Sequence, residues 1–289
     1  MKLKPGISTC LIVYNSERNI RECLESIKDI SDEILVLHDG PCKDNTLKIA
    51  REYTKNIFVR PHKGQCEFHQ AFLYRKAKYS WILKIDADEF LSKELHKEIR
   101  KLIQNLEVEA YSFLWLFWDG KKYVTKKWSR KVCLYRKDKI SYVGFPNWGE
   151  PKILGKVEYS NLRLEHHPPV GNVPTLKIFL NQGIKRCIIP QAKATLEDFA
   201  SFDRFNYSSK EQPIRIKIRK YLPLLTAFPF ATLSFFKVLL TEGAWKEGKP
   251  ALKVATSNFF YYLYLGYYIH KLKQGKNIDK PVFLENFVR

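Results

Sequence analysis

The sequence has no closely spaced cysteine pair, although it contains six cysteines among its 289 residues. Structural zinc sites and disulfide frameworks both depend on clustered or paired cysteines, so neither is expected here. Scattered single cysteines are typical of proteins in a reducing compartment. The six positions are Cys10, Cys23, Cys42, Cys66, Cys133 and Cys187.

Long apolar runs are also lacking. Residues 7–13 are mostly apolar, but this run is too short for a signal-peptide core, and Asn15 and Glu17 follow at once. Residues 221–236 carry no charge, yet this run is only about sixteen residues long and a membrane-spanning helix needs about twenty. We therefore expect a cytoplasmic protein.

Acidic residues are too few to balance the basic ones. Lys and Arg number 50 against 30 Asp and Glu, which gives a net charge of +20. Such a surplus favours anionic partners: nucleic acids, acidic lipid surfaces or phosphorylated substrates. The aromatic-rich stretch 257–269 lies between basic residues, as interfacial membrane segments do. We favour peripheral docking on the anionic inner face of the membrane, and an ordinary helical subdomain packing on the sheet is the alternative.

A glycine-rich phosphate loop is absent after the first predicted strand, where the sequence reads Tyr14-Asn15-Ser16-Glu17. This absence counts against a nucleotidyltransferase, a class that also uses paired carboxylates. Nucleic-acid binding, or nucleotide binding without group transfer, is a further alternative because of the basic charge. The aromatic residues cluster near the C-terminus instead of alternating with Lys and Arg along a strand, so no nucleic-acid partner is expected.

Strands and helices alternate over the first ninety residues. Short apolar runs predict buried strands, and apolar residues at helical spacing between them predict helices. This alternation predicts an α/β fold with a mainly parallel sheet, and strand-like runs at 110–117 and 131–136 predict antiparallel additions. The predicted strands are 7–13, 33–37, 57–59 and 81–85, and the predicted helices are 17–28, 44–53, 67–78 and 93–105.

Three carboxylates fall within four positions directly after the strand 81–85, in Asp86-Ala87-Asp88-Glu89. Like charges this close need a positive partner, and a divalent cation that carries phosphate oxygens would provide one. Ligands of open α/β sheets bind at the carboxyl ends of the strands, which is where these residues are expected. Helix capping by Asp88 or Ser92 would explain only one polar residue.

Taken together, the motifs resemble family 2 glycosyltransferases. The resemblance rests on residues 7–15 with Glu17, on the stretches 33–40 and 43–46, and on Asp86-Ala87-Asp88-Glu89. Residues 128–136, 148–150 and 164–166 are similar to the branch that adds sugars to lipopolysaccharide cores. Residues 222–248 look like the membrane-proximal segment of that branch.

The resemblance implies a GT-A (Rossmann-like) fold and inverting transfer from a nucleotide-sugar donor with Mn²⁺ or Mg²⁺. It implies a catalytic domain over residues 1–208, with a nucleotide-sugar half (1–91) and an acceptor half (92–208), and a C-terminal helical segment at the membrane (209–289). The expected acceptor is a lipid-linked or lipopolysaccharide-type glycan of the cell envelope.

The resemblance also implies roles for individual residues. The general base is Glu150 or Glu89, and the metal ligands are Asp88, Asp86 and His166, with His167 as an alternative to His166. The nucleotide contacts are Thr9, Tyr14, Asn15, Glu17, Asp39, Lys63, Asp86, Arg130 and Arg136. The family's usual basic residue before the Asp-x-Asp strand is replaced here by Phe68-His69-Gln70-Ala71. Lys63 or His69 would take over its role.

Overall fold

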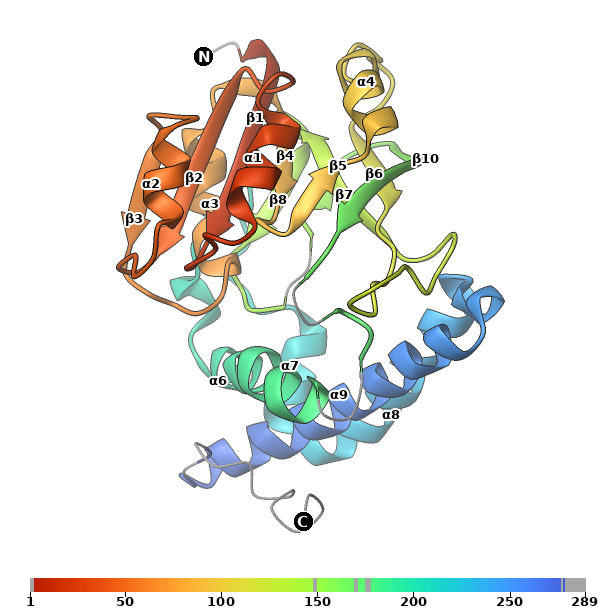
Figure 1. The fold of residues 1–289 in the computed structure, drawn as a ribbon. Coiled ribbons are helices and arrows are strands. Elements are labelled where there is room, and N and C mark those ends of the chain that lie inside the picture. The colour runs from red at the N-terminus through yellow and green to blue at the C-terminus, as the bar shows by residue number, and fades with distance from the viewer. Residues whose placement is uncertain (1–2, 148–149, 169–170, 175–177, 277, 279–289) are drawn as a thin grey trace. The chain divides into compact units, whose positions relative to one another are not determined.

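The computed structural model describes residues 3–147, 150–168, 171–174, 178–276 and 278 (Figure 1). The chain forms two compact units. Unit 1 consists of residues 1–144, 148–172 and 203–207, and unit 2 of residues 145–147, 173–202 and 208–289.

Unit 1 is built on an eight-stranded sheet. Strands β7 and β5 run antiparallel to their neighbours, and the other six run in one direction. The predicted mainly parallel α/β sheet with antiparallel additions is therefore confirmed. Across the sheet the strands are β3 (Ile57–Arg60), β2 (Glu33–Asp39), β1 (Lys4–Val13), β4 (Tyr79–Ile85), β7 (Arg130–Arg136), β6 (Ala110–Leu114), β10 (Val157–His166) and β5 (Glu89–Leu91).

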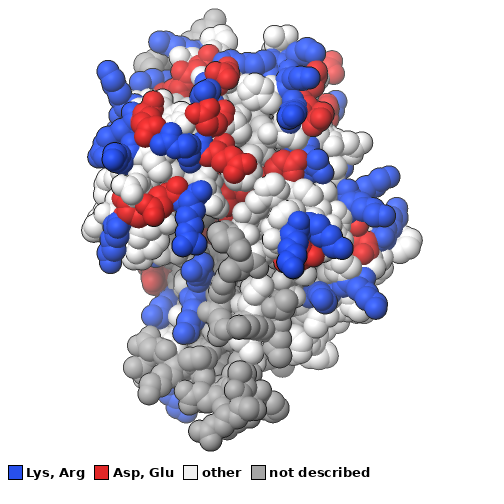
Figure 2. Space-filling model, in the orientation of Figure 1, with Lys and Arg blue, Asp and Glu red and all other residues white. Residues whose placement is uncertain are grey.

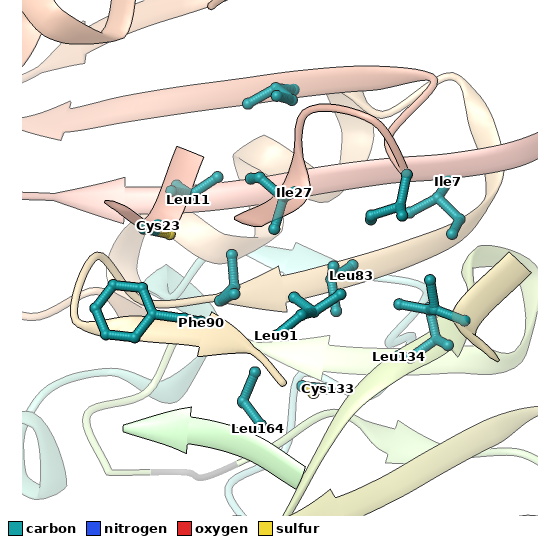
Figure 3. Close-up of a cluster of buried hydrophobic side chains, with 14 of the residues drawn as sticks. Ile7, Leu11, Cys23, Ile27, Leu83, Phe90, Leu91, Cys133, Leu134 and Leu164 are labelled. Carbon is teal, nitrogen blue, oxygen red and sulfur yellow. The ribbon is translucent and has the colours of Figure 1, made fainter. Parts of the chain in front are cut away.

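Both faces of this sheet are covered, so its strands are apolar on both sides. Leu11 of β1 joins a core with α1 (Ile20–Ile27), α2 (Thr46–Arg51) and α4 (Lys93–Leu102), part of which Figure 3 shows. Its neighbour Cys10 faces the second core, formed with α3 (Glu67–Lys76) and a small three-stranded sheet. That small sheet consists of β11 (Arg204–Phe205), β8 (Ile140–Val143) and β9 (Lys152–Ile153).

The side chains of β4 point alternately to the two faces of the sheet, up to its polar end. Trp81, Leu83 and Ile85 belong to the core on the α1 side, and Ile82 belongs to the core on the α3 side. Because successive side chains point to opposite faces, Lys84 is directed to the α3 side, as Ile82 is. A buried strand thus carries a lysine just before the cluster of carboxylates.

Unit 2 is helical. Phe179, Ile184 and Ile188 pack against Leu265 and Ile269 in one buried core. This packing places residues 173–202 in the helical unit, so the boundaries of the two compact units differ from the predicted division at residue 208. The main helices of unit 2 are a π-helix (Phe179–Ile188), α6 (Ile189–Leu196), α7 (Ile214–Tyr221), α8 (Pro223–Phe236) and α9 (Lys249–Lys273). Its short helices are Phe199–Ser201, Lys237–Thr241 and Ala244–Glu247. The end of the predicted C-terminal segment, 279–289, lies outside the described residues.

The apolar helix of unit 2 is longer than the sequence predicts. Helix α8 continues through Lys237 as a π-helix, so the apolar helical run covers Pro223–Thr241 and is 19 residues long. Its mean hydropathy is 1.6, and only 11% of it is buried. By length and composition this one helix could cross a membrane, because Lys237 does not end it.

On the face shown in Figure 2, Lys and Arg of unit 1 alternate with Asp and Glu. No single basic patch dominates that face.

Candidate active site

The candidate site lies at the carboxyl ends of the parallel strands of unit 1. There the loop after β1 is fastened to the loop after β2. Asn15 accepts a hydrogen bond from the backbone of Lys43 (3.0 Å), and Glu17 accepts one from the backbone of Asn45 (2.9 Å). Asn15 has a φ of 46°, a left-handed conformation that Asn tolerates. Asn15 and Glu17 therefore shape the loop at this edge.

Asp39, at the end of β2, is enclosed by a third loop. Its carboxylate accepts hydrogen bonds from the backbone of Lys63 (2.7 Å), the backbone of Gly64 (2.8 Å) and the ring of His69 (2.8 Å). Burial alone would raise the pKa of Asp39, but these hydrogen bonds outweigh it and the pKa is lowered. Both oxygens are thus engaged, which does not support the predicted contact with the nucleotide base. Lys63 donates its backbone N–H to Asp39, and the nucleotide contact of its side chain stays a prediction.

Tyr14 forms an aromatic pair with His62 above this loop. The ring centroids are 4.7 Å apart, Tyr14 is 46% exposed, and the His62 side chain is half exposed. A Cβ at Gly40 would come within 2.8 Å of the Cβ of His62, so the close approach of the two loops requires glycine there. The pair offers exposed ring faces at the edge of the sheet.

Two lysines neutralise Asp86. Lys84 lies 2.9 Å from one oxygen of Asp86, and Lys131, on β7, lies 2.8 Å from the other. Burial would raise the pKa of Asp86, but the charges of Lys131 and Lys84 hold it well below its usual range. Because both oxygens are held by ammonium groups, this geometry does not support Asp86 as a metal ligand or ribose contact.

Glu89 is fully buried and fully hydrogen-bonded. It accepts from the indole of Trp115 (2.7 Å), from the backbone of Asp86 (2.8 Å) and from Lys131. A general base must reach the hydroxyl that it deprotonates. A buried carboxylate with these partners is not positioned to do so, and this geometry does not support Glu89 as the alternative base.

Asp88 and His166 are brought together from different strands. The Asp88 carboxylate, 30% exposed, lies 3.5 Å from Nε2 of His166, at the end of β10. The His166 ring stacks on Trp115 at 4.3 Å, and its Nδ1 lies 3.0 Å from the amide of Asn172. Carboxylate and imidazole groups both suit a divalent cation. Asp88 and His166 therefore fit a metal, whereas Asp86 does not. The alternative His167 hydrogen-bonds the hydroxyl of Tyr123 at 2.8 Å.

Glu150 lines a cavity of about 290 Å³ together with Lys84, Asp86, Lys131 and Trp115. Its carboxylate accepts a hydrogen bond from the backbone of Val132 (2.9 Å). Although the residue is exposed by surface area, the protein atoms around its carboxylate raise its pKa to about 7. A carboxylate with this pKa is matched to proton abstraction near neutral pH. Trp148 and Gly149 of the predicted Trp-Gly-Glu motif lie outside the described residues.

The structure does not support two other predicted nucleotide contacts, because of their position along a strand. Arg136 pairs with Trp81, at the opposite end of β4 from Asp86. Thr9 is buried four residues before the end of β1 and hydrogen-bonds Ser31. At about 3.3 Å per residue, Thr9 lies roughly 13 Å from that end. Arg130 does line the cavity, and its guanidinium also donates to the backbone of Ser160.

A second group of metal-type side chains lies beside this edge. His38, Cys42 and Asp44 are the one such trio found within the described ranges. Both ring nitrogens of His38 already have partners, at the backbone of Gly40 and of Asn15, and the thiol of Cys42 donates to Asp44. The trio is accounted for by these hydrogen bonds, which shape the loop after β2.

Residues 8–160, more than half of the chain, match the family profile described as "Glycosyl transferase family 2". The chain belongs to glycosyl transferase family 2. The resemblance of the strand-end motifs to this family is thereby confirmed, and the matched region contains Asp39, Asp86, Asp88 and Glu150.

Similar proteins cover parts of this family 2 chain. An uncharacterized glycosyltransferase of Rickettsia typhi is 34% identical over 105 residues, which is 36% of this chain and 35% of that protein. The SPbeta prophage-derived glycosyltransferase SunS of Bacillus subtilis is 28% identical over 179 residues, which is 61% of this chain and 40% of SunS. The chain thus spans well under half the length of these relatives.

Solved structures give a weaker overall likeness. TarS of S. aureus has a TM-score of 0.46 at 13% identity, covering 87% of this chain and 55% of TarS. Glucosyl-3-phosphoglycerate synthase from Mycobacterium tuberculosis, crystallised with Mn²⁺ and UDP-glucose, has a TM-score of 0.42 at 15% identity, covering 63% of this chain and 79% of that one.

Three residues of this family 2 site are not identified by sequence reasoning: Lys84, Lys131 and His62. Lys84 carries a detectable signal, because it stands two positions before Asp86 in an otherwise apolar strand and so shares a face with it. Lys131 becomes visible only through the pairing of β7 with β4. His62 depends on how the loop after β3 folds back over Gly40.

Proposed function

We propose that this family 2 member is an inverting, divalent-metal-dependent glycosyltransferase. It transfers a sugar from a nucleotide-sugar donor to a lipid-linked or lipopolysaccharide-type glycan acceptor of the cell envelope. The observation that carries the proposal is the family match over residues 8–160, together with the Asp88–His166 pair and the position of Glu150 in the cavity that Asp86 also lines.

The nucleotide-sugar donor binds at the edge of the sheet formed by the loops that follow β1, β2 and β3. Tyr14 and His62 present exposed aromatic faces on which a nucleotide base stacks. Asn15 and Glu17 contribute by holding the loop after β2 through its backbone. The buried carboxylate of Asp39 holds the loop that carries His62, because it accepts hydrogen bonds from the backbone of Lys63 and Gly64. Arg130 lines the neighbouring cavity and supplies positive charge for the anionic donor, whereas Lys84 and Lys131 of the same lining are paired with Asp86 and Glu89.

Asp88 and His166 hold the metal. When bound, Mn²⁺ or Mg²⁺ supplies positive charge to the leaving diphosphate. Glu150 takes the proton of the acceptor hydroxyl as its oxygen forms a bond to the anomeric carbon. The bond from that carbon to the diphosphate breaks, and the diphosphate leaves with the electron pair. Because attack comes from the face opposite the leaving group, the configuration inverts.

We place the enzyme on the inner face of the membrane. Helix α8 and its continuation expose several large apolar side chains, including Leu225 (72%), Leu233 (67%) and Phe228 (63%). Exposed apolar surface of this kind marks an interaction face, and basic residues in the same unit suit anionic lipids. The length of the run Pro223–Thr241 is compatible with insertion as well as with docking.

Donor binding is the direct test. Thermal unfolding is followed for the wild-type chain, Asp88→Ala and the exposed control Asp29→Ala, with UDP, GDP, CDP and ADP, each with and without Mn²⁺. A ligand that binds the folded state raises its melting temperature. The proposal predicts a Mn²⁺-dependent shift with one nucleotide that is lost in Asp88→Ala and kept in Asp29→Ala. A full Mn²⁺-dependent shift in Asp88→Ala would overturn the metal assignment.

A further inference from the structure

Unit 2 contains a large cavity that the transfer chemistry does not use. Its volume is about 720 Å³. It lies between the start of the π-helix and the first half of α9, and all of its described lining residues belong to unit 2. They are Pro174, Phe179, Leu180, Lys249, Leu252, Lys253, Thr256, Ser257, Phe260 and Tyr264.

The cavity is long, and its lining is mainly apolar. The lining positions on α9 recur every three or four residues from Lys249 to Tyr264, so they form one stripe along the helix. At 1.5 Å per residue this stripe is about 22 Å long. Phe179 and Leu180 cover it and are almost fully buried, whereas Leu252 and Phe260 are about half exposed. An elongated apolar groove with an open side suits a hydrocarbon chain better than a compact polar metabolite.

One end of the stripe is cationic. Lys249 and Lys253 are exposed at the N-terminal end of α9, where the helix dipole also favours an anion. Within the described lining no Asp or Glu opposes them. Ammonium groups at the mouth of an apolar groove match the charge of a phosphate on a long hydrocarbon chain.

We propose that this cavity binds the hydrocarbon chain of a phosphate-bearing lipid, with the phosphate on Lys249 and Lys253. The inference rests on the proposed lipid-linked acceptor and gives it a binding site. It places the recognition of the lipid in unit 2, on residues separate from those that hold the donor.

The experiment measures binding of a dansyl-labelled alkyl phosphate by the full chain, followed by fluorescence and by competition with unlabelled hexadecyl phosphate and hexadecanol. Ser257→Trp fills the cavity, and Ser257→Ala is its conservative control. Lys249→Glu/Lys253→Glu reverses the cationic end. Lys210→Glu/Lys246→Glu is the matched control, because both residues are exposed and neither lines the cavity. Circular dichroism confirms that each variant is folded.

The expected result is saturable binding that weakens at least tenfold in Ser257→Trp and in Lys249→Glu/Lys253→Glu but not in either control. Hexadecyl phosphate competes, and hexadecanol competes at least tenfold less well. Unchanged binding in a folded Ser257→Trp would overturn the proposal, as would equal competition by the alcohol. Capture of an apolar peptide without any binding of the alkyl phosphate would also overturn it. The nucleotide-induced thermal shift of the same samples reports donor binding separately, so failure of the lipid site is distinguishable from failure of the transferase.

Discussion

Lys131 donates hydrogen bonds to both carboxylate oxygens of Glu89, at 2.6 and 2.7 Å. Glu89 has no exposed surface, and the Lys131 side chain is only 12% exposed. Lys131 therefore neutralises the buried negative charge of Glu89. Lys131 also pairs with Asp86, so one lysine neutralises much of the charge of the carboxylate cluster at the end of β4.

Removing the lysine should destabilise the fold more than it changes the site. In Lys131→Met the Glu89 carboxylate stays buried without its partner, which costs about 3–5 kcal/mol. The free energy of unfolding, measured by urea denaturation, should fall by about that amount. The double variant Lys131→Met/Glu89→Gln should recover a large part of the loss. A single variant within about 1 kcal/mol of wild type would show that the pair is not buried as described.

Glu150 should give the transfer reaction a characteristic pH dependence. Its pKa is raised to about 7, and a general base must be ionised. The rate should therefore rise with pH up to about 7 and level off above it. The raised pKa also means that the ionised form destabilises the folded chain above pH 7. Glu150→Gln should accordingly raise the melting temperature more at pH 8 than at pH 5, and the opposite order would contradict the raised pKa.

The aromatic pair above the β2 loop should contribute to nucleotide affinity. Stacking of a base on an aromatic ring is worth about 1–3 kcal/mol. Tyr14→Ala should therefore weaken binding of the matching nucleoside diphosphate roughly 5- to 150-fold by calorimetry. Tyr221→Ala is a suitable control, because Tyr221 is 68% exposed and lies at the end of α7 in unit 2. Equal affinities in all three proteins would remove Tyr14 from the donor site.

The packing of α8 on α9 should depend on Gly266. A Cβ at this position would come within 2.6 Å of the Cβ of Ala227 and of the Pro223 carbonyl oxygen. Gly266→Ala should lower the free energy of unfolding of unit 2 by about 1–3 kcal/mol through overpacking. At Gly183 the nearest atom is 3.3 Å away on the Phe179 ring, so Gly183→Ala should be much milder. Equal effects of the two substitutions in thermal unfolding would contradict this packing.

The sequence allows the first half of the fold to be predicted because its strands are continuous apolar runs with helices between them. Strand β5 is missed because it has only three residues and starts at a glutamate. The helices of residues 178–196 are missed because Gly183 and Pro190 interrupt their pattern, although apolar packing against α9 stabilises them.

At the site, motif position identifies the edge of the sheet but not the partners of each side chain. Asp88 and His166 are predicted in adjacent roles and lie together. The role of Lys131 could not be predicted, because a lysine in a strand is expected to be exposed to solvent. Only the pairing of β7 with β4 shows that it is buried beside Asp86 and Glu89. Arg136 is misplaced for the same reason, since strand direction decides which end of β7 meets Asp86.

The central claim is that Glu150 is the base of a glycosyl transfer. The most direct measurement is sugar transfer from radiolabelled nucleotide-sugars to a membrane lipid extract, with Mn²⁺, by wild type, Glu150→Gln and the exposed control Glu107→Gln. If Glu150 is the base, Glu150→Gln should lower kcat about 100-fold or more while the nucleotide-induced thermal shift is kept. Glu107→Gln should behave as wild type. A Glu150→Gln variant that transfers sugar at the wild-type rate would show that Glu150 is not the base.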